Sequence, residues 1–316
     1  MPIGESLGHL GVSRATYYRW VKQAAWLQAR KEPVTPVQAF EALPEEKSAV
    51  RKYALAHPEI RHRELSWRMI DEDVAYLSSS TVYRILREQN LVCRHRGRVK
   101  RYREADEKAT RSDEIWATDL MYLTVAGEQF YLVSFMDEYS RYLLHFELLS
   151  RMDGHSISIA AQRALETLPK NRDGSLADQP RIRSDNGSGY ISGEFKSLLS
   201  HHQLVHQRIK PNCPEENGLI ERFHRTLREG IEELELDGRY EAERQLTAVI
   251  EHYNNERLHS SLDFQTPHTW YRGNPAKVTS KRRMKMAQAR HRRKQINLGI
   301  RQRTLPISTN ESFTCS

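Results

Sequence analysis

Three acidic residues have types and positions that could support metal-dependent chemistry. Asp119 lies in the middle of the apolar stretch WATDLMY. Period-two alternation places it on the face of Ala117 and Met121, where an ionised carboxylate is costly unless it is paired or bound to a metal. Asp185 comes directly after the short run RIRS, and Glu221 lies within a long amphipathic segment. Carboxylate oxygens are the ligands that hard cations prefer, so these positions indicate a candidate cation site.

Other interpretations of these and neighbouring acids remain open. In SDNGSGYIS, Asp185 begins an Asp-Asn-Gly sequence, and Asn and Gly tolerate the positive φ of a tight turn. On this stretch alone, a simple turn is the stronger interpretation. Glu215 and Glu216 precede a predicted helix and favour its N-terminus electrostatically. Asp137 fits a hairpin turn.

The elements that must position these acids alternate from residue 114 onward. IWATDLMYLTV, QFYLVSFMDEYS and RYLLHFELLS are rich in β-branched and aromatic residues and predict a three-strand meander. A helix from about Asp153, a strand RIRSD, a helix SGEFKSLLSHHQL and a strand VHQRIK follow. The last segment, PEENGLIERFHRTLREGIEELE, predicts a long helix. Its buried stripe at helical spacing comprises Ile220, Phe223, Leu227, Ile231 and Leu234. This order predicts a mixed α/β layered domain.

Two helical segments precede this domain. LGVSRATYYRW, residues 10–20, predicts the second half of a helix-turn-helix, with Gly11 in the turn and Ser13 as the N-cap. The residues there that could face DNA are Arg14, Thr16 and Tyr17. Residues 40–93 predict three short helices that fit a second helix-turn-helix-like module, with Arg84 and Arg87 on its outer surface. A capped surface helix and a plain three-helix bundle are the respective alternatives.

Positive charge is concentrated in two parts of the chain. The net charge is +8, but residues 1–263 carry a net charge of −3. Between Phe264 and Asn310 there are 12 Lys and Arg and no acidic residue. We therefore expect residues 276–316 to form a basic, partly disordered tail that binds nucleic acid through Arg292, Arg293 and Lys294. Residues 94–113 begin with RHRGRVKRYR and are expected to form a basic linker.

Several classes of protein do not fit the composition. No apolar run approaches the roughly 20 residues that span a bilayer, and no signal peptide opens the chain, so a cytoplasmic location is expected. The three cysteines are far apart and form neither a disulfide framework nor a CxxC zinc motif. His201, His202 and His206 leave zinc binding as a minor alternative.

The motifs together resemble the retroviral-integrase-like core of bacterial insertion-sequence transposases. The matching segments are WATDLMYL, SDNGSGYIS and PNCPEENGLIERFHRTLRE. The 35 residues between Asp185 and Glu221 match the spacing of the last two acids in that family's catalytic triad. Arg228, seven positions after Glu221, matches its Lys/Arg position, and HYNNERLHSSLDFQTPHTWY matches its usual ending. The upstream helix-turn-helix segments match the family's DNA-binding part, so the resemblance covers about residues 7–275.

This resemblance implies a fold and a site. Residues 114–275 would form a ribonuclease H-like core, preceded by a partial helix-turn-helix in residues 1–30. Asp119, Asp185 and Glu221 would be the catalytic residues and would bind two Mg²⁺ ions, with Mn²⁺ as a substitute in vitro. Asp119 would bridge both ions. The DNA-contacting residues of the core would be Arg228, Arg225, Asn217 and Asn186.

The resemblance also implies an activity and partners. The protein would cleave double-stranded DNA at the terminal repeats of an element and join the freed 3′-OH to target DNA. It would act as a homo-oligomer on paired ends in the bacterial nucleoid, alone or with the product of an upstream frame. Two alternatives remain: a nuclease or resolvase on the same fold, and a non-catalytic DNA-binding regulator derived from a transposase.

Overall fold

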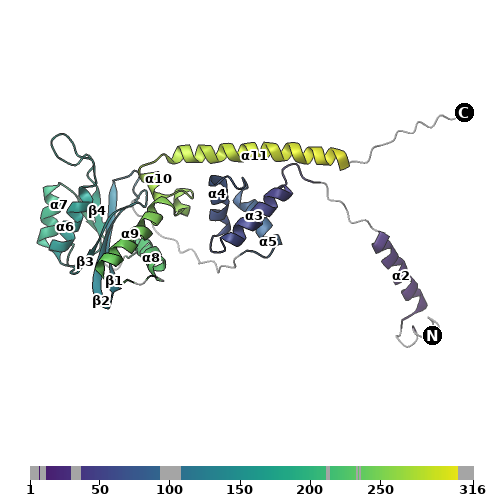
Figure 1. The fold of residues 1–316 in the computed structure, drawn as a ribbon, viewed down its shortest axis with the longest axis horizontal. Coiled ribbons are helices and arrows are strands. Elements are labelled where there is room, and N and C mark those ends of the chain that lie inside the picture. The colour runs from purple at the N-terminus through teal and green to yellow at the C-terminus, as the bar shows by residue number, and fades with distance from the viewer. Residues whose placement is uncertain are drawn as a thin grey trace. The chain divides into compact units, whose positions relative to one another are not determined.

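The computed structural model describes residue 7 and residues 12–29, 37–92, 108–210, 214–232, 234 and 236–304. The chain divides into two compact units, one of Met1–Ser48 with Met286–Ser316 and the other of Ala49–Lys285 (Figure 1). The second unit contains the sheet that positions the candidate site. Among the described residues, no helix is both long and apolar enough to cross a bilayer.

A five-stranded mixed sheet forms the centre of the second unit. Its strands are β1 (Ile115–Val125), β2 (Glu128–Asp137), β3 (Leu143–Leu149), β4 (Arg181–Ser184) and β5 (His206–Arg208). The spatial order is β3-β2-β1-β4-β5, with β2 antiparallel to both neighbours and the β1–β4 and β4–β5 pairs parallel. Ala126 and Gly127 join β1 to β2 with φ of 48° and 82°, which suits a tight hairpin turn. The predicted meander is confirmed.

Helices cover both faces of this sheet (Figure 1). On one face lie α6 (Gly154–Leu165) and α7 (Gly193–His201), and on the other lie α8 (Gly218–Ile231) and α9 (Arg239–Asn255). Short helices η2 (Ser260–Leu262) and α10 (Pro267–Tyr271) follow α9.

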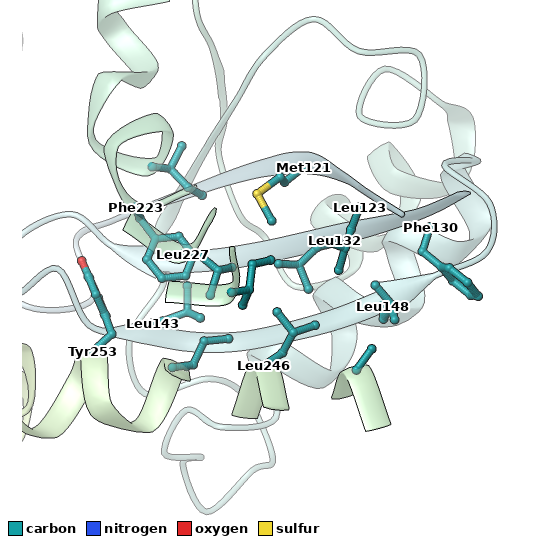
Figure 2. Packing of buried hydrophobic residues seen from close by; sticks show 14 of the residues in the cluster. Met121, Leu123, Phe130, Leu132, Leu143, Leu148, Phe223, Leu227, Leu246 and Tyr253 are labelled. Atoms are coloured by element: carbon teal, nitrogen blue, oxygen red, sulfur yellow. The ribbon is translucent and has the colours of Figure 1, made fainter. Parts of the chain in front are cut away.

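Each face of the sheet has its own apolar core, because side chains alternate along a strand. Trp116 packs with the α6 and α7 side chains, whereas Met121 packs with Phe223 and Leu227 of α8 and Leu246 of α9 (Figure 2). The three-layer arrangement and the strand order are those of a ribonuclease H-like domain. The predicted fold class is therefore confirmed.

The predicted long helix is shorter than expected. A 3₁₀ turn, η1 (Pro214–Asn217), precedes α8, and α8 ends at Ile231. Leu234 is 38% exposed, so its assignment to the buried stripe is wrong, while the other four members are buried. The physical reason is the reversal of the chain towards α9, which Gly238 allows with its φ of 94°.

Helices occur where they were predicted in the N-terminal part. In the first unit, α2 (Arg14–Ala29) follows Ser13, whose Oγ accepts the Thr16 N–H at 3.2 Å, which confirms the predicted N-cap. Gly11 lies outside the described residues. Beyond α2 come α3 (Pro44–Ala56), α4 (His62–Asp71) and α5 (Ser79–Glu88). The Ser78 hydroxyl caps α5 through the Thr81 N–H at 3.3 Å.

The basic region after the core differs from its prediction. Residues Pro275–Thr304 form one helix, α11, rather than a partly disordered tail. The segment is rich in Ala, Lys, Arg, Met and Gln, which are strong helix formers, and Pro275 fits a first helical turn. Residues 305–316 and most of the predicted linker lie outside the described residues.

Several polar side chains of α11 are buried against other parts of the chain. In the first unit, Arg293 is 7% exposed and its Nε lies 3.0 Å from Oε1 of Glu46. In the second unit, Arg282 is 5% exposed, binds both carboxylate oxygens of Asp71 at 2.9 and 2.6 Å, and donates to the Phe264 carbonyl at 2.7 Å. These two cations have protein partners, which the sequence alone did not indicate.

Candidate active site

Asp119 is positioned by the pairing of β1 with β2. The register places Asp119 opposite Ser134, so the two side chains share the sheet face that α8 covers. His224 of α8 is 6% exposed and lies between them. Its Nδ1 is 3.5 Å from Asp119 Oδ2, and its Nε2 is 3.4 Å from the Ser134 hydroxyl. The other Asp119 oxygen, Oδ1, accepts the Leu120 N–H at 2.9 Å.

Asp185 is brought beside Asp119 by the parallel pairing of β4 with β1. Arg183 is aligned with Ala117, and Asp185 and Asp119 each lie two residues further along their chains. Asp185 Oδ1 accepts the Gly187 N–H at 2.9 Å, which is the local turn that the sequence predicted. Partial burial raises the pKa of Asp185, and the negative charge of Asp119 raises it further. Asp185 is therefore both a turn residue and half of a carboxylate pair.

A buried tyrosine supports this pair from the opposite face of the sheet. Tyr190 is 1% exposed, and its hydroxyl lies 3.0 Å from the Thr118 hydroxyl. Burial raises the pKa of Tyr190 well above its usual value, and the charges of Asp119 and Asp185 add to the increase. The contact between the two hydroxyls connects the loop after Asp185 to the neighbour of Asp119 in β1.

Glu221 lies on α8 one turn before His224, and its side chain is exposed. The described residues contain no group of three or more His, Cys, Asp or Glu side chains arranged to hold a metal ion. The structure therefore brings Asp119 and Asp185 together but does not gather Glu221 with them into a metal-ligand cluster.

The remaining predicted residues of the core have different exposures. Arg225 and Arg228 are exposed on α8; Arg225 Nε lies 3.8 Å from Glu229, and Arg228 has no ion pair with any residue the structure describes. Asn186 is also exposed, and its amide nitrogen donates to the Ile209 carbonyl at 2.9 Å, which ties the Asp185 loop to the end of β5. Asn217 is only 3% exposed, which differs from the surface position expected of a DNA contact.

Outside the core, most of the predicted DNA contacts are accessible. Arg14, Arg84, Arg87, Arg292 and Lys294 are exposed, and Thr16 and Tyr17 are half-buried. Arg293 is the exception because it is buried against Glu46. DNA binding by the accessible residues stays a prediction.

The competing polar residues have structural partners. The side chain of Asp137 accepts the Ser140 N–H at 2.8 Å and the Asp113 N–H at 2.9 Å, which confirms its role in the turn. The ring nitrogens of His202 and His206 lie 2.8 Å from Gln162 Oε1 and from the Ser184 hydroxyl, respectively. The zinc interpretation therefore gains no support from these contacts.

Sequence reasoning missed His224, Ser134 and Tyr190. A signal existed for His224, since it lies three positions after Glu221 and one after Phe223, at the edge of the buried stripe. A polar side chain at such a position needs a partner. Ser134 and Tyr190 carried no comparable signal, because their contacts depend on strand register and on the fold of the Asp185 loop.

Comparison with known proteins is consistent with this arrangement. Two family models, both described as integrase core domain, match residues 109–214 and 202–267. The transposase of insertion sequence element IS904 from Lactococcus lactis is 29% identical over 51% of this chain and 62% of its own length. The putative transposase InsK of element IS150 from Escherichia coli is 27% identical over 54% of this chain and 63% of its own length. The chain thus spans less than two thirds of these two relatives.

A solved structure with a related fold is the catalytic core domain of HTLV-2 integrase in complex with magnesium. It is 15% identical, covers 52% of this chain and 99% of its own, and has a TM-score of 0.41. The two family matches extend continuously from residue 109 to residue 267 and include Asp119, Asp185 and Glu221. Over this stretch the chain matches an integrase core domain, and it is similar to insertion-sequence transposases.

Proposed function

We propose that the chain is a DNA transposase that cleaves DNA at the ends of an element and joins the 3′-OH to target DNA. The observation that carries this proposal is the pairing of Asp119 with Asp185 at adjacent strands of an integrase core domain. In each carboxylate one oxygen accepts a backbone N–H, from Leu120 and from Gly187, and the other oxygen has no backbone partner among the described residues. Such a pair of carboxylates is suited to binding a ligand rather than to packing in the protein interior.

The chemistry of this pair fits a divalent cation. Two carboxylates close together in a partly buried place repel one another, and a hard cation with oxygen ligands removes that repulsion. We propose that Asp119 and Asp185 bind Mg²⁺, with Glu221 as the third ligand and two ions in all. When bound, such ions supply charge neutralisation and an activated oxygen nucleophile for phosphodiester chemistry.

The chain's own residues prepare this site and recognise the substrate. His224 and the Leu120 N–H hold the two oxygens of Asp119, which fixes the orientation of the carboxylate. Arg225 and Arg228 lie on the exposed surface of α8 and would bind phosphates of the DNA. Exposed Arg84 and Arg87 of α5 would contact element ends. Since two element ends must be joined together, a homo-oligomer is the expected active form.

A strand-transfer assay on the purified chain tests the proposal. The substrate is a labelled duplex that ends in the terminal repeat of the element, with a supercoiled plasmid as target and Mg²⁺ present. Joined product supports a transposase. Cut product without joining supports a nuclease or resolvase on the same fold. Binding without either product supports a DNA-binding regulator.

A further inference from the structure

A second polar cluster lies on the flank of α8 that faces away from Asp119. Arg222 follows Glu221 directly, and the rotation of about 100° per residue in a helix places it towards Phe223. The Phe223 ring packs edge-to-face on Tyr253 of α9, with 4.9 Å between the centroids. Tyr253 lies at one end of the apolar core (Figure 2), and His259 packs edge-to-face on it, again at 4.9 Å.

Three arginines from separate segments lie near Tyr253 and His259. Arg222 comes from α8, Arg257 follows α9, and Arg141 lies in the turn between β2 and β3 with φ of 64°. Burial and, to a smaller extent, the positive charges of Arg257, Arg141 and Arg222 together lower the pKa of His259 to about 4. The same three cations oppose the increase that burial causes in the pKa of Tyr253.

The segments that carry these arginines are held together by a buried amide. The Asn254 side chain accepts the Leu143 N–H at 2.9 Å and donates to the Leu143 carbonyl at 3.0 Å. Asn254 is next to Tyr253, and Leu143 is two residues after Arg141. These bonds therefore fix the segments that carry Arg257 and Arg141 relative to one another.

The positive charge of the cluster is only partly balanced by the residues that the structure describes. Glu138 and Asp137 both interact electrostatically with Arg141. The Glu138 carboxylate is bound by Arg183 through two hydrogen bonds of 2.7 and 2.9 Å, and Asp137 accepts the Ser140 and Asp113 N–H groups. Arg141 donates instead to the backbone carbonyl of Glu138. Arg222 and Arg257 are exposed, and neither forms an ion pair with a residue that the structure describes.

Neutral hydrogen-bonding groups of the same cluster are also unused. Nε2 of His259 is buried and has no hydrogen-bond partner in the described part of the chain. A group with several oxygens and a negative charge matches the three cations, because guanidinium donors bind phosphate oxygens in pairs.

We propose that Arg141, Arg222 and Arg257 form a binding site for a phosphate of the DNA backbone. This inference rests on the proposed action of the core on DNA and adds a contact outside the Asp119–Asp185 site. Because Arg222 and Glu221 are consecutive on α8, the site would bind the DNA that reaches the reaction centre, on the other flank of the helix. Such a contact positions the duplex and carries no sequence information.

The test compares DNA binding by two variants of the full chain in EDTA, where no catalysis occurs. Arg222→Ala/Arg257→Ala removes the two exposed cations, and Arg172→Ala removes an exposed cation of the core that lies far along the chain from this cluster and has no ion pair with a described residue. Affinity for a duplex is measured over a series of salt concentrations, and thermal unfolding confirms that both variants fold. The log–log salt slope should fall by about 0.9 for each lost phosphate contact in the double variant only.

DNA in which single phosphates are replaced by neutral analogues then locates the contact. Duplexes carrying single methylphosphonates should weaken binding of the wild-type chain at a limited set of positions. The double variant should lose this sensitivity at one or two of them, and Arg172→Ala should keep the full pattern. An unchanged slope and pattern in the double variant would overturn the inference even if strand transfer is normal. A changed pattern in a chain without cleavage or joining would support the site and refute the proposed function.

Discussion

Two acidic sites lie only a few residues apart on the central sheet, and their negative charges differ in their partners. Glu138, directly after β2, is 4% exposed and forms a two-bond ion pair with Arg183 of β4. Asp119 and Asp185 lie close to one another, and each has a backbone N–H on one oxygen. Arg183 and Asp185 are only two residues apart in the chain.

This difference separates an acid with a structural partner from the acidic pair that we propose to bind a cation. A buried charge that has a complete partner inside the protein holds two strands together and has no capacity for a ligand. Two like charges that the fold holds close together repel one another, and this repulsion costs free energy. The repulsion is removed when a cation binds. Substitution at the two sites should therefore have different consequences, in activity at one and in stability at the other.

The largest effect is expected at the paired aspartates. Asp119→Asn and Asp185→Asn should each reduce cleavage and strand transfer by about a thousandfold or more, since several kcal/mol of charge stabilisation is lost. The melting temperature in EDTA should not fall, because each change removes one of two mutually repelling charges. Glu221→Gln belongs to the same series if Glu221 is the third ligand. A variant that keeps more than a tenth of the wild-type rate would show that its residue is not a metal ligand.

The next effect is expected at the buried ion pair. Glu138→Gln removes the carboxylate that binds the buried Arg183 cation and should reduce the free energy of unfolding by about 3–5 kcal/mol. The measurement is chemical denaturation, with Glu229→Gln of an exposed pair on α8 as the control that should change little. The double change Glu138→Leu/Arg183→Met should recover most of the loss. Equal stability of Glu138→Gln and Glu229→Gln would mean that this pair does not hold the sheet together.

His224 shares a feature with each site, because it is buried and contacts Asp119, which we propose as a metal ligand. We expect His224→Phe to weaken metal binding and activity by about 10- to 100-fold, as for other residues that orient a metal ligand. His224→Asn keeps a hydrogen-bonding group and should recover part of the loss. The readouts are the Mg²⁺ concentration for half-maximal activity and the Mn²⁺-dependent rise in melting temperature. An unchanged metal requirement in His224→Phe would limit His224 to a packing role.

The sequence predicted the second unit well because its signals are local. Alternating apolar residues gave β1 to β3, the Ala126-Gly127 pair gave the hairpin, and helical spacing gave the buried face of α8. Asp119 and Asp185 were assigned to one site through the resemblance to the transposase core, and the structure brings them together by the parallel pairing of β4 with β1. His224 and Ser134 escaped prediction because their contact depends on how α8 is rotated over the sheet.

The main discrepancy lies in α11, where charge suggested a solvated tail. A run of cations without apolar periodicity does not reveal that a helix can be buried through its polar side chains. Arg282 and Arg293 are examples, since their partners Asp71 and Glu46 lie more than 200 residues earlier in the chain. Asn297 is a third, because its amide nitrogen donates to the carbonyls of Gln38 and Glu41 at 3.1 and 2.9 Å. No local pattern encodes such distant contacts.

Two neighbouring arginines of α11 show a similar contrast between a buried charge with a protein partner and a charge exposed to solvent. Arg293 is buried with Glu46, whereas Arg292 is 71% exposed in a side-chain contact of 3.3 Å with Glu45. Arg293→Ala should lower stability by about 1–3 kcal/mol, because Glu46 loses one hydrogen-bond partner and keeps the Leu43 N–H at 2.9 Å. Arg292→Ala should change stability by no more than about 0.5 kcal/mol. It should also reduce the salt dependence of DNA binding, which Arg293→Ala should leave unchanged. Thermal unfolding and salt-dependent binding of the two variants check both expectations, and equal losses of stability would mean that burial does not distinguish these two charges.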